Sequence, residues 1–170
     1  MLFYLFFILI VCQRISELFM AKRNERWMKE RGAQEFGQVH YPLIVFIHIM
    51  FFIIFLLEVK IWKNGLSPIW PSLLAAFICT QFIRIWALTS LGKYWNTKII
   101  ILPGANLVKK GPYRFLKHPN YIVVAIEFMV IPFMFQAYFT ALFFSLLNVI
   151  IMRIRIPAEE AALTYLIESP

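Results

Sequence analysis

The sequence contains no aspartate, three histidines and only two cysteines. Cys12 and Cys79 each lie within an apolar run, so we expect packed or lipid-facing side chains rather than a disulfide or a metal pair. Three scattered histidines without aspartate also argue against a metal site. No CxxC, HExxH, Walker or GxGxxG pattern is present. The sequence therefore does not indicate the enzyme classes that carry these motifs.

Charge is also scarce. Charged residues make up 15% of the 170 residues and hydrophobic residues 61%, whereas soluble proteins have about 25% charged and about 45–50% apolar residues. Several apolar runs approach or exceed the roughly 20 residues that cross a bilayer core. The N-terminus lacks the basic region and the small-residue cleavage site of a secretory signal peptide. The composition predicts an integral membrane protein with a single domain over residues 1–170.

Five apolar runs predict an all-α protein with about five transmembrane helices. The runs are Leu2 to Met20, Tyr41 to Val59, Ile69 to Leu91, Tyr121 to Phe135 and Ala137 to Met152. The last two are short and are separated only by Gln136, so we expect a tight helical hairpin. Residues 1–91 would hold three spans. Residues 92–170 would hold a loop with the candidate functional residues, the hairpin and a C-terminal segment.

The basic residues are unevenly placed along the chain. Thirteen of the 17 lie in residues 21–40, in residues 92–120 or at Arg153 and Arg155. Because basic loops face the cytoplasm, this pattern predicts a protein of the cytoplasmic membrane with its N-terminus outside the cell and its C-terminus in the cytoplasm. An odd number of spans, five, also places the two termini on opposite sides. The net charge of +8 then reflects topology and attraction to anionic lipid rather than nucleic-acid binding.

The first candidate site is the stretch GPYRFLKHPNY, residues 111–121. Pro119 suits the first turn of a helix, which would place His118 beside free backbone N–H groups and Tyr121 on the same face. A helix N-terminus among cations is suited to an anionic group. The nearby cations are Lys109, Lys110, Arg114 and Lys117. The alternative is an interfacial anchor, where tyrosine, lysine and arginine are enriched.

The second candidate site follows the last apolar run and contains Arg153, Arg155, Glu159 and Glu160. One helix would allow Arg155 to pair with Glu159, although we expect Pro157 to bend or restart the helix. Two carboxylates beside two guanidinium groups are suited to binding an acid and handling a proton. The alternative is a basic end of a span followed by a solvated acidic turn.

Four further charged residues lie within the predicted spans, namely Arg14, Glu17, Arg84 and Glu127. Ionisable groups at membrane depth usually face a bundle interior or a cavity and are functional candidates. Arg14 and Glu17 are three residues apart and able to pair, and a structural Arg84–Glu127 ion pair is the alternative to a functional role. His48 is expected to be a packed or hydrogen-bonded helix residue rather than a ligand.

The stretch GPYRFLKHPNY, an apolar hairpin and then RIPAEEAAL together resemble the isoprenylcysteine carboxyl methyltransferases. The resemblance covers roughly Leu91 to Leu163. It implies a helical membrane bundle, S-adenosylmethionine as the cofactor, a cofactor pocket that faces the cytoplasm and a lateral opening for lipid. It also implies a lipophilic acceptor, and it leaves the oligomeric state open.

The resemblance also implies roles for individual residues. His118 and Tyr121 match positions that contact the cofactor, and Lys117 stands where the family commonly has arginine. The preceding loop, which would line the cofactor pocket, comprises Gly111, Pro112 and Tyr113. The catalytic positions near the reacting group would be Arg155 and Glu160, with Glu159 beside them. Pro157-Ala158 replaces acidic residues of eukaryotic members, and the chain lacks additional N-terminal spans. A compact prokaryotic-type member is therefore predicted, which argues against a prenylated protein as acceptor.

The acceptor is less defined than the cofactor. A carboxylate nucleophile needs a cation to orient it, for which Arg155 is the candidate. A hydroxyl near pKa ~10 benefits from a base, for which Glu160 is the candidate. The sequence permits methylation of an isoprenylcysteine-type carboxylate or of a lipidic polyketide hydroxyl. Alternatives are a membrane NADPH-dependent reductase of the sterol-reductase-like type, a phospholipid N-methyltransferase, and a transporter or scaffold without enzymatic activity.

Overall fold

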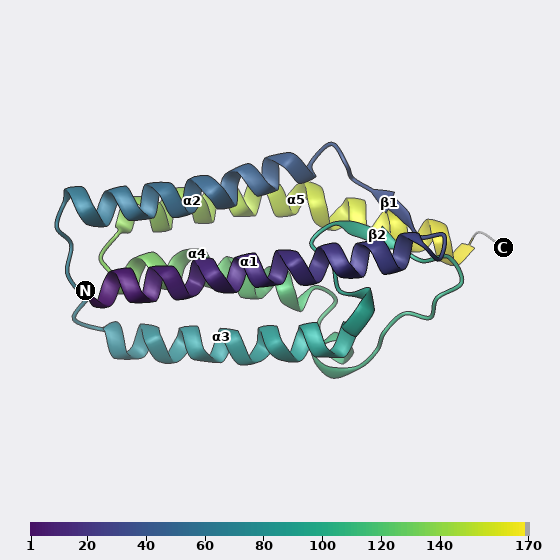
Figure 1. Ribbon diagram of the computed structural model, residues 1–170, viewed down its shortest axis with the longest axis horizontal. Helices are drawn as coiled ribbons and strands as arrows, with labels where there is room; N and C mark the ends of the chain where they lie inside the picture. Colours follow the sequence, from purple (N-terminus) through teal and green to yellow (C-terminus); the bar gives the residue numbers. More distant parts are fainter. Residues whose placement is uncertain (169–170) are drawn as a thin grey trace.

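The computed structural model describes the backbone of residues 1–168 and the side chains of residues 1–164. The described chain forms an elongated helical bundle (Figure 1), which confirms the predicted all-α membrane fold. The bundle helices are α1 (Leu2–Lys29), α2 (Tyr41–Ile61), α3 (Trp70–Leu91), α4 (Pro119–Met134) and α5 (Tyr138–Glu168). Short elements complete the fold, namely the strands β1 (Gln34–Phe36) and β2 (Ile99–Ile101) and the 3-10 helices η1 (Gly92–Tyr94) and η2 (Gly111–Arg114).

Four of the helices in the described part of the chain, α1, α2, α3 and α5, are long and apolar enough to cross a membrane. The 16 residues of α4 extend over about 24 Å, less than the roughly 30 Å of a bilayer core. Large apolar side chains are exposed along the bundle, including Leu5 at 65% and Phe82 at 69%. A surface of this kind is suited to contact with lipid rather than water.

The predicted hairpin of α4 and α5 is present, and its turn is held by a charged residue of α2. The carboxylate of Glu58 accepts hydrogen bonds from the backbone N–H groups of Phe139 at 3.0 Å and Thr140 at 2.8 Å, and from the Thr140 hydroxyl. These N–H groups belong to the first turn of α5, where no intrahelical acceptor exists. Glu58 therefore connects the hairpin turn to α2.

The second half of the hairpin is longer than the sequence indicates. We expected the apolar run to end at Met152 and Pro157 to bend or restart the helix. The helix does not restart there, because α5 continues through Pro157 to Glu168. A proline inside a helix removes one hydrogen bond and crowds the carbonyl four residues before it, at a cost of about 3 kcal/mol. The helical hydrogen bonds before and after Pro157 remain. Helix α5 therefore carries Arg155 and Glu159 on one continuous element.

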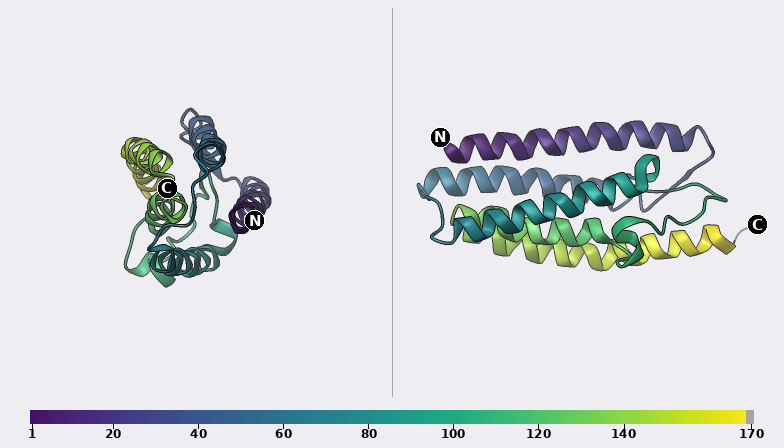
Figure 2. Two further views of the ribbon diagram at one scale, coloured as in Figure 1. Left: turned by 90° about the vertical axis from the view of Figure 1, so that its left-hand side faces the viewer. Right: turned by 90° about the horizontal axis from the view of Figure 1, so that it is seen from below.

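The bundle has two different ends. The N-terminus, the α2–α3 connection and the α4–α5 turn lie at one end, and the C-terminus lies at the other (Figures 1 and 2). The α1–α2 connection and residues 92–118 lie at the same end as the C-terminus (Figure 1). The basic segments of the sequence therefore gather at one end of the molecule, opposite the N-terminus.

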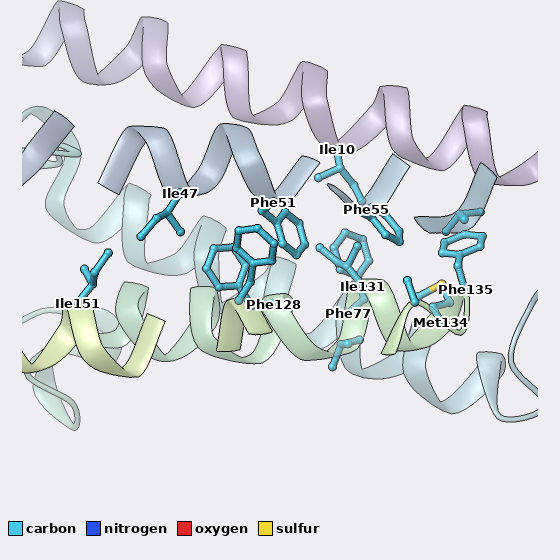
Figure 3. Packing of buried hydrophobic residues seen from close by; sticks show 14 residues of the cluster. Ile10, Ile47, Phe51, Phe55, Phe77, Phe128, Ile131, Met134, Phe135 and Ile151 are labelled. Atoms are coloured by element: carbon cyan, nitrogen blue, oxygen red, sulfur yellow. The ribbon is translucent and has the colours of Figure 1, made fainter. Parts of the chain in front are cut away.

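The interior of the bundle is dominated by phenylalanine (Figure 3). The rings of Phe51 on α2 and Phe128 on α4 stack with centroids 4.7 Å apart, and Phe144 of α5 meets Phe51 edge-on at 5.5 Å. Aromatic pairs of this kind contribute about 0.5–1.5 kcal/mol beyond the burial of their area. The packing brings α2, α4 and α5 together around one line of rings.

Residues 99–101 form β2, one of the two strands of a small sheet. β2 pairs antiparallel with β1, with Ile101 opposite Gln34 and Ile99 opposite Phe36. Lys98, just before β2, contacts Glu25 of α1 at 2.8 Å and Glu35 of β1 at 3.1 Å. The pairing and the ion pairs connect the long loop before α4 to the α1–α2 connection.

Candidate active site

The two motifs of the sequence meet at the basic end of the bundle. Helix α4 begins at Pro119, as predicted, with His118 as the residue before its first turn. The His118 ring stacks on the Tyr121 ring with centroids 5.3 Å apart and an interplanar angle of 18°. The part of α5 that carries Arg155 and Glu159 lies against this stack.

Tyr121 stands between the two charged residues of α5. The Arg155 Nε–H group donates to the Tyr121 hydroxyl oxygen at 2.8 Å, and the Tyr121 hydroxyl donates to the Glu159 carboxylate. A guanidinium group has no acceptor, so the tyrosine proton is directed at the carboxylate. Arg155 and Glu159, which the spacing suggested as a direct pair, are thus connected through Tyr121.

Arg155 is also held by the loop between α3 and β2. Its Nη2 group donates to the backbone carbonyl of Thr97, and the residue is only 7% exposed. The Thr97 hydroxyl lies 3.1 Å from the hydroxyl of Tyr41 at the start of α2. Contacts with α4 and with the Thr97 loop therefore fix the guanidinium group of a residue on α5.

Glu160 occupies a different position from its neighbour Glu159. Its Oε1 atom lies 3.4 Å from His118 Nε2 and 3.4 Å from Lys117 Nζ, and 45% of its side chain is exposed. Glu159 lies 3.6 Å from His118 Nδ1 with 29% of its side chain exposed. Both carboxylates therefore face His118. Arg153, by contrast, is exposed on α5.

The Gly111–Pro112–Tyr113 stretch forms η2, which packs on the end of α3. A Cβ atom on Gly111 would lie 2.0 Å from Ser90 Oγ and 2.9 Å from Trp86 Nε1, and Gly111 has a φ of +56°. Only glycine fits this combination of contact and backbone angle. Pro112 is buried, and burial followed by the nearby Glu159 charge raises the pKa of Tyr113 above its usual value.

A cavity of about 390 Å³ opens beside these residues, within the usual size range of ligand sites. Glu159, Arg155, Tyr121, His118, Lys117 and Tyr113 line its polar end, whereas Gly111, Pro112 and Glu160 are not part of its wall. Its longer walls are apolar and come mainly from α1 and α2. The apolar lining from these two helices comprises Val11, Ile15, Leu18, Ile44, Val45, Ile49 and Phe52.

Three residues of the cavity wall each have a polar atom that is buried without a hydrogen-bond partner in the described structure, namely Trp95 Nε1, Asn120 Oδ1 and Arg84 Nε. Unsatisfied buried groups are uncommon and point to a missing ligand or water. S-adenosylmethionine carries amino and hydroxyl donors and carboxylate and ring-nitrogen acceptors. Its chemistry therefore fits an indole N–H and an amide oxygen beside Lys117 and Arg155 at the polar end of the cavity, which we call the cavity mouth.

Sequence reasoning did not identify four residues of this site: Tyr41, Trp95, Thr97 and Asn120. Asn120 lies within the motif and is the one residue of the four that a motif search would find. Tyr41, Trp95 and Thr97 belong to segments without a recognisable pattern, and they enter the site only because the chain folds back. Among residues whose placement the structure describes, no group of three or more His, Cys, Asp or Glu side chains is arranged so that it could hold a metal ion.

The charged residues within the spans form one buried network. Arg84 contacts Glu17 at 3.1 Å and also contacts Glu127, and Arg14 contacts Glu17 at 2.8 Å and also Glu127. The Arg14–Glu17 pairing that the spacing allowed and the Arg84–Glu127 ion pair considered as the alternative to a functional role are both present, and the two pairs contact each other. The Gln81 side chain donates to Glu127 at 2.7 Å. The network has two cations and two anions.

Comparison with known proteins relates this chain to one family and to two bacterial proteins. The sequence profile of the isoprenylcysteine carboxyl methyltransferase family matches residues 73–165. "Uncharacterized protein YpbQ" of Bacillus subtilis (strain 168) is 45% identical over 95% of this chain and 96% of its own length. An "Uncharacterized protein" of Haemophilus influenzae is 28% identical over 94% of each chain. No solved structure matches.

Proposed function

Since the chain belongs to the isoprenylcysteine carboxyl methyltransferase family, we propose that it is a membrane methyltransferase that uses S-adenosylmethionine. Its acceptor is a lipophilic molecule, methylated on a carboxylate or an acidic hydroxyl. The supporting observation is the hydrogen-bonded series from Arg155 through Tyr121 to Glu159. All three residues of this series line the cavity, which also has apolar walls.

The residues that would hold the cofactor lie around the cavity mouth. His118, Lys117 and Tyr113 line this end, and Asn120 and Trp95 offer the unpartnered acceptor and donor. Gly111 and Pro112 act indirectly, because they hold η2 against α3 and so position Tyr113. The cofactor supplies a methyl group that its own sulfonium charge activates. The protein therefore has to position the acceptor and exclude water.

Arg155 is the residue that orients the acceptor oxygen. Its Nε and Nη2 groups already donate to Tyr121 and Thr97, which leaves Nη1 to donate to an acceptor in the cavity. A carboxylate acceptor, with a pKa near ~4, needs no base at neutral pH. A hydroxyl acceptor would pass its proton to Glu159, which lies on the cavity wall. The same arrangement serves either nucleophile.

Glu160 has a supporting role in this arrangement. The resemblance to the family implies that the last glutamate lies near the reacting group, whereas Glu160 here contacts Lys117 and His118 at the mouth. We propose that Glu160 holds these two residues toward the cofactor while Glu159 faces the acceptor. The positions of both carboxylates beside His118 support this division.

We also propose that the basic end of the bundle faces the cytoplasm. The loops at that end carry most of the basic residues, as the positive-inside rule requires. In this orientation the polar end of the cavity is accessible to a water-soluble cofactor. The apolar walls from α1 and α2 are at membrane depth, where a lipophilic acceptor is concentrated.

Calorimetry on the detergent-purified protein tests the cofactor. We expect S-adenosylhomocysteine to bind and NADPH not to bind, since a membrane reductase would show the opposite preference. His118→Ala removes the ring that stacks on Tyr121 and should weaken S-adenosylhomocysteine binding by about tenfold, the equivalent of 1.4 kcal/mol. Unchanged affinity in His118→Ala would remove His118 from the cofactor site.

Transfer of radiolabelled methyl from S-adenosylmethionine to an organic-extractable membrane fraction tests the activity. If the acceptor is a hydroxyl, Glu159→Gln should lower the rate by about 10²–10⁴, the typical contribution of a positioned acid or base. Glu160→Gln should mainly raise the KM for the cofactor. If Glu160→Gln abolishes transfer and leaves cofactor affinity unchanged, Glu160 is the base instead. The absence of any labelled product would contradict the proposed function.

A further inference from the structure

The inner end of the cavity is polar, although it lies at membrane depth. Beyond the apolar lining, the wall contains Arg14, Glu17 and Arg84 of the buried network and His48 of α2. The His48 ring lies 5.1 Å from the ring of Phe128. Phe128 is seven residues beyond Tyr121 on α4, which corresponds to about 10 Å or two helical turns. None of these inner residues is needed by the proposed methyl transfer.

One donor at this end has no partner. Arg84 uses Nη1 for Glu17 and Nη2 for Glu127, but its Nε–H group is buried and unpaired among the side chains that the structure describes. Only 3% of the Arg84 side chain is exposed. A buried donor without an acceptor loses its hydration and gains nothing in return, so the position favours a ligand that supplies an oxygen.

One acceptor at this end is also free. The Nδ1 atom of His48 lies 2.8 Å from the backbone carbonyl of Ile44. A carbonyl only accepts, so Nδ1 carries the proton, and Nε2 of the neutral ring is then an acceptor. Within residues 1–164, no hydrogen bond to Nε2 is present. The inner end thus combines an unused N–H donor with an unused ring-nitrogen acceptor.

The charge balance limits what this end takes. The network has two arginines and two glutamates in mutual contact. An added anion or cation would leave a buried charge without compensation, which is strongly unfavourable. A neutral group that both accepts from Arg84 and donates to His48 suits this end, and a hydroxyl does both through a single oxygen atom.

We propose that the inner end of the cavity is a second polar subsite, formed by Arg84 and His48. It binds a hydroxyl group on the body of the lipophilic acceptor, about two helical turns from the oxygen that receives the methyl group. This inference rests on the proposed function, because it takes the cavity to be the acceptor site. It assigns the acceptor to amphiphiles with two separated oxygen functions rather than to simple hydrocarbon-tailed acids or alcohols.

Calorimetry with two probes tests the subsite on the detergent-purified protein. The probes are stearate and 10-hydroxystearate, which share one chain length and one carboxylate and differ in a mid-chain hydroxyl. We expect 10-hydroxystearate to bind about three- to tenfold more tightly, the equivalent of one net hydrogen bond. Equal affinities, or failure of 10-hydroxystearate to bind, would overturn the proposal.

Variants of His48 and Arg84 test whether these two residues form the subsite. His48→Leu should abolish the preference for the hydroxylated probe, and His48→Gln, which keeps an acceptor, should retain it. Arg84→Lys keeps a cation for Glu17 and Glu127 but lacks Nε–H, so it should also lose the preference. Val45→Ala, one turn from His48 on the apolar wall, is the matched control and should weaken both probes equally.

Two results separate this proposal from the proposed function. A wild-type protein that does not bind S-adenosylhomocysteine contradicts the methyltransferase assignment, whatever the ratio between the two fatty acids. If His48→Leu weakens S-adenosylhomocysteine and leaves that ratio unchanged, the cofactor occupies the inner end. The hydroxyl subsite is then wrong, and the methyltransferase assignment stands.

Discussion

The Nε–H group of Arg155 donates a 2.8 Å hydrogen bond to the hydroxyl oxygen of Tyr121, which connects α5 to the first turn of α4. Because arginine cannot accept, the tyrosine proton is committed to Glu159. Two motifs, one on each helix of the hairpin, thereby form one hydrogen-bonded unit. A substitution at Tyr121 should therefore alter the hydrogen bonding of both Arg155 and Glu159.

Tyr121→Phe is the direct test of this unit. The substitution keeps the ring that stacks on His118 but removes the hydroxyl, which leaves the largely buried Arg155 Nε–H without a partner. A lost hydrogen bond to a charged group costs about 1.5–3 kcal/mol, so we expect kcat to fall by about 10- to 100-fold. S-adenosylhomocysteine affinity should change little. Methyl transfer at the wild-type rate would show that the unit is not required.

Gly111→Ala should displace η2 from α3. The new Cβ would approach Ser90 Oγ to 2.0 Å at a φ of +56°, and a positive φ alone costs roughly 1–2 kcal/mol. Gly104→Ala is the matched control, because Gly104 has a φ of +75° but no neighbouring atom within 4 Å of the point where a Cβ would stand. We expect only Gly111→Ala to weaken cofactor binding in calorimetry. Equal losses in both variants would mean that backbone strain, and not the close approach to α3, accounts for the effect.

Glu58→Gln should loosen the turn between α4 and α5. The Glu58 carboxylate is 6% exposed and accepts from two backbone N–H groups and the Thr140 hydroxyl. Hydrogen bonds to a charged group contribute about 1.5–3 kcal/mol each, so a clear decrease in the thermal unfolding midpoint in detergent is expected. Glu30→Gln, which alters an exposed carboxylate 3.9 Å from Arg31, is the control and should change the midpoint little. Similar midpoints for both variants would contradict a role for Glu58 at the turn.

The ion pairs beside the sheet predict a pH dependence of stability. Burial raises the pKa of Glu35, but hydrogen bonds and charge from Lys29 and Lys98 outweigh it and hold that pKa below its usual value. Burial lowers the pKa of Lys98, and Glu25 and Glu35 more than reverse this. A carboxyl with a depressed pKa stabilises the fold above its unfolded pKa and loses this contribution as pH falls through the folded value. A raised lysine pKa stabilises the fold below the unfolded pKa and loses it as pH rises through the folded value.

Thermal unfolding of Glu35→Gln against wild type measures this contribution. The difference between the two midpoints should be largest near neutral pH and should vanish in acid well below pH ~4, where the carboxyl is protonated in both states. The effect should be modest, within about 1 kcal/mol, because these ion pairs are partly solvated. A difference that does not change with pH would attribute the stabilisation to packing of the side chain instead.

Local sequence signals predicted the helical elements well. Pro119 marked the start of α4 because a proline fits only the first turn without loss, and Gln136 marked the hairpin turn. The possible restart of the helix at Pro157 was a wrong prediction from the same local signal. A proline raises the cost of a helix, but the adjoining turns of α5 already form it, so one missing hydrogen bond does not end the helix.

Contacts between distant segments could not be predicted in this way. Thr97 reaches Arg155 through a backbone carbonyl, which every residue possesses, so no residue type signals the contact. Glu58 holds the start of α5 across 82 residues of sequence. The pairing of Ile99–Ile101 with Gln34–Phe36 was also not predicted, because Gln34–Phe36 has no β-forming pattern of its own.

The amino-acid sequence by itself determined that this is a membrane protein of five helices with its basic residues at one end. Whether a helix buries its apolar side chains in lipid depends on the length and apolar composition of its segment, and both can be read directly from the sequence. Tertiary structure alone decided that Tyr121 lies between Arg155 and Glu159, that Glu159 rather than Glu160 faces the cavity, and that Arg84 and His48 both line its inner end. Hydrogen-bond direction and cavity shape depend on which helices pack together, and no single segment encodes that packing.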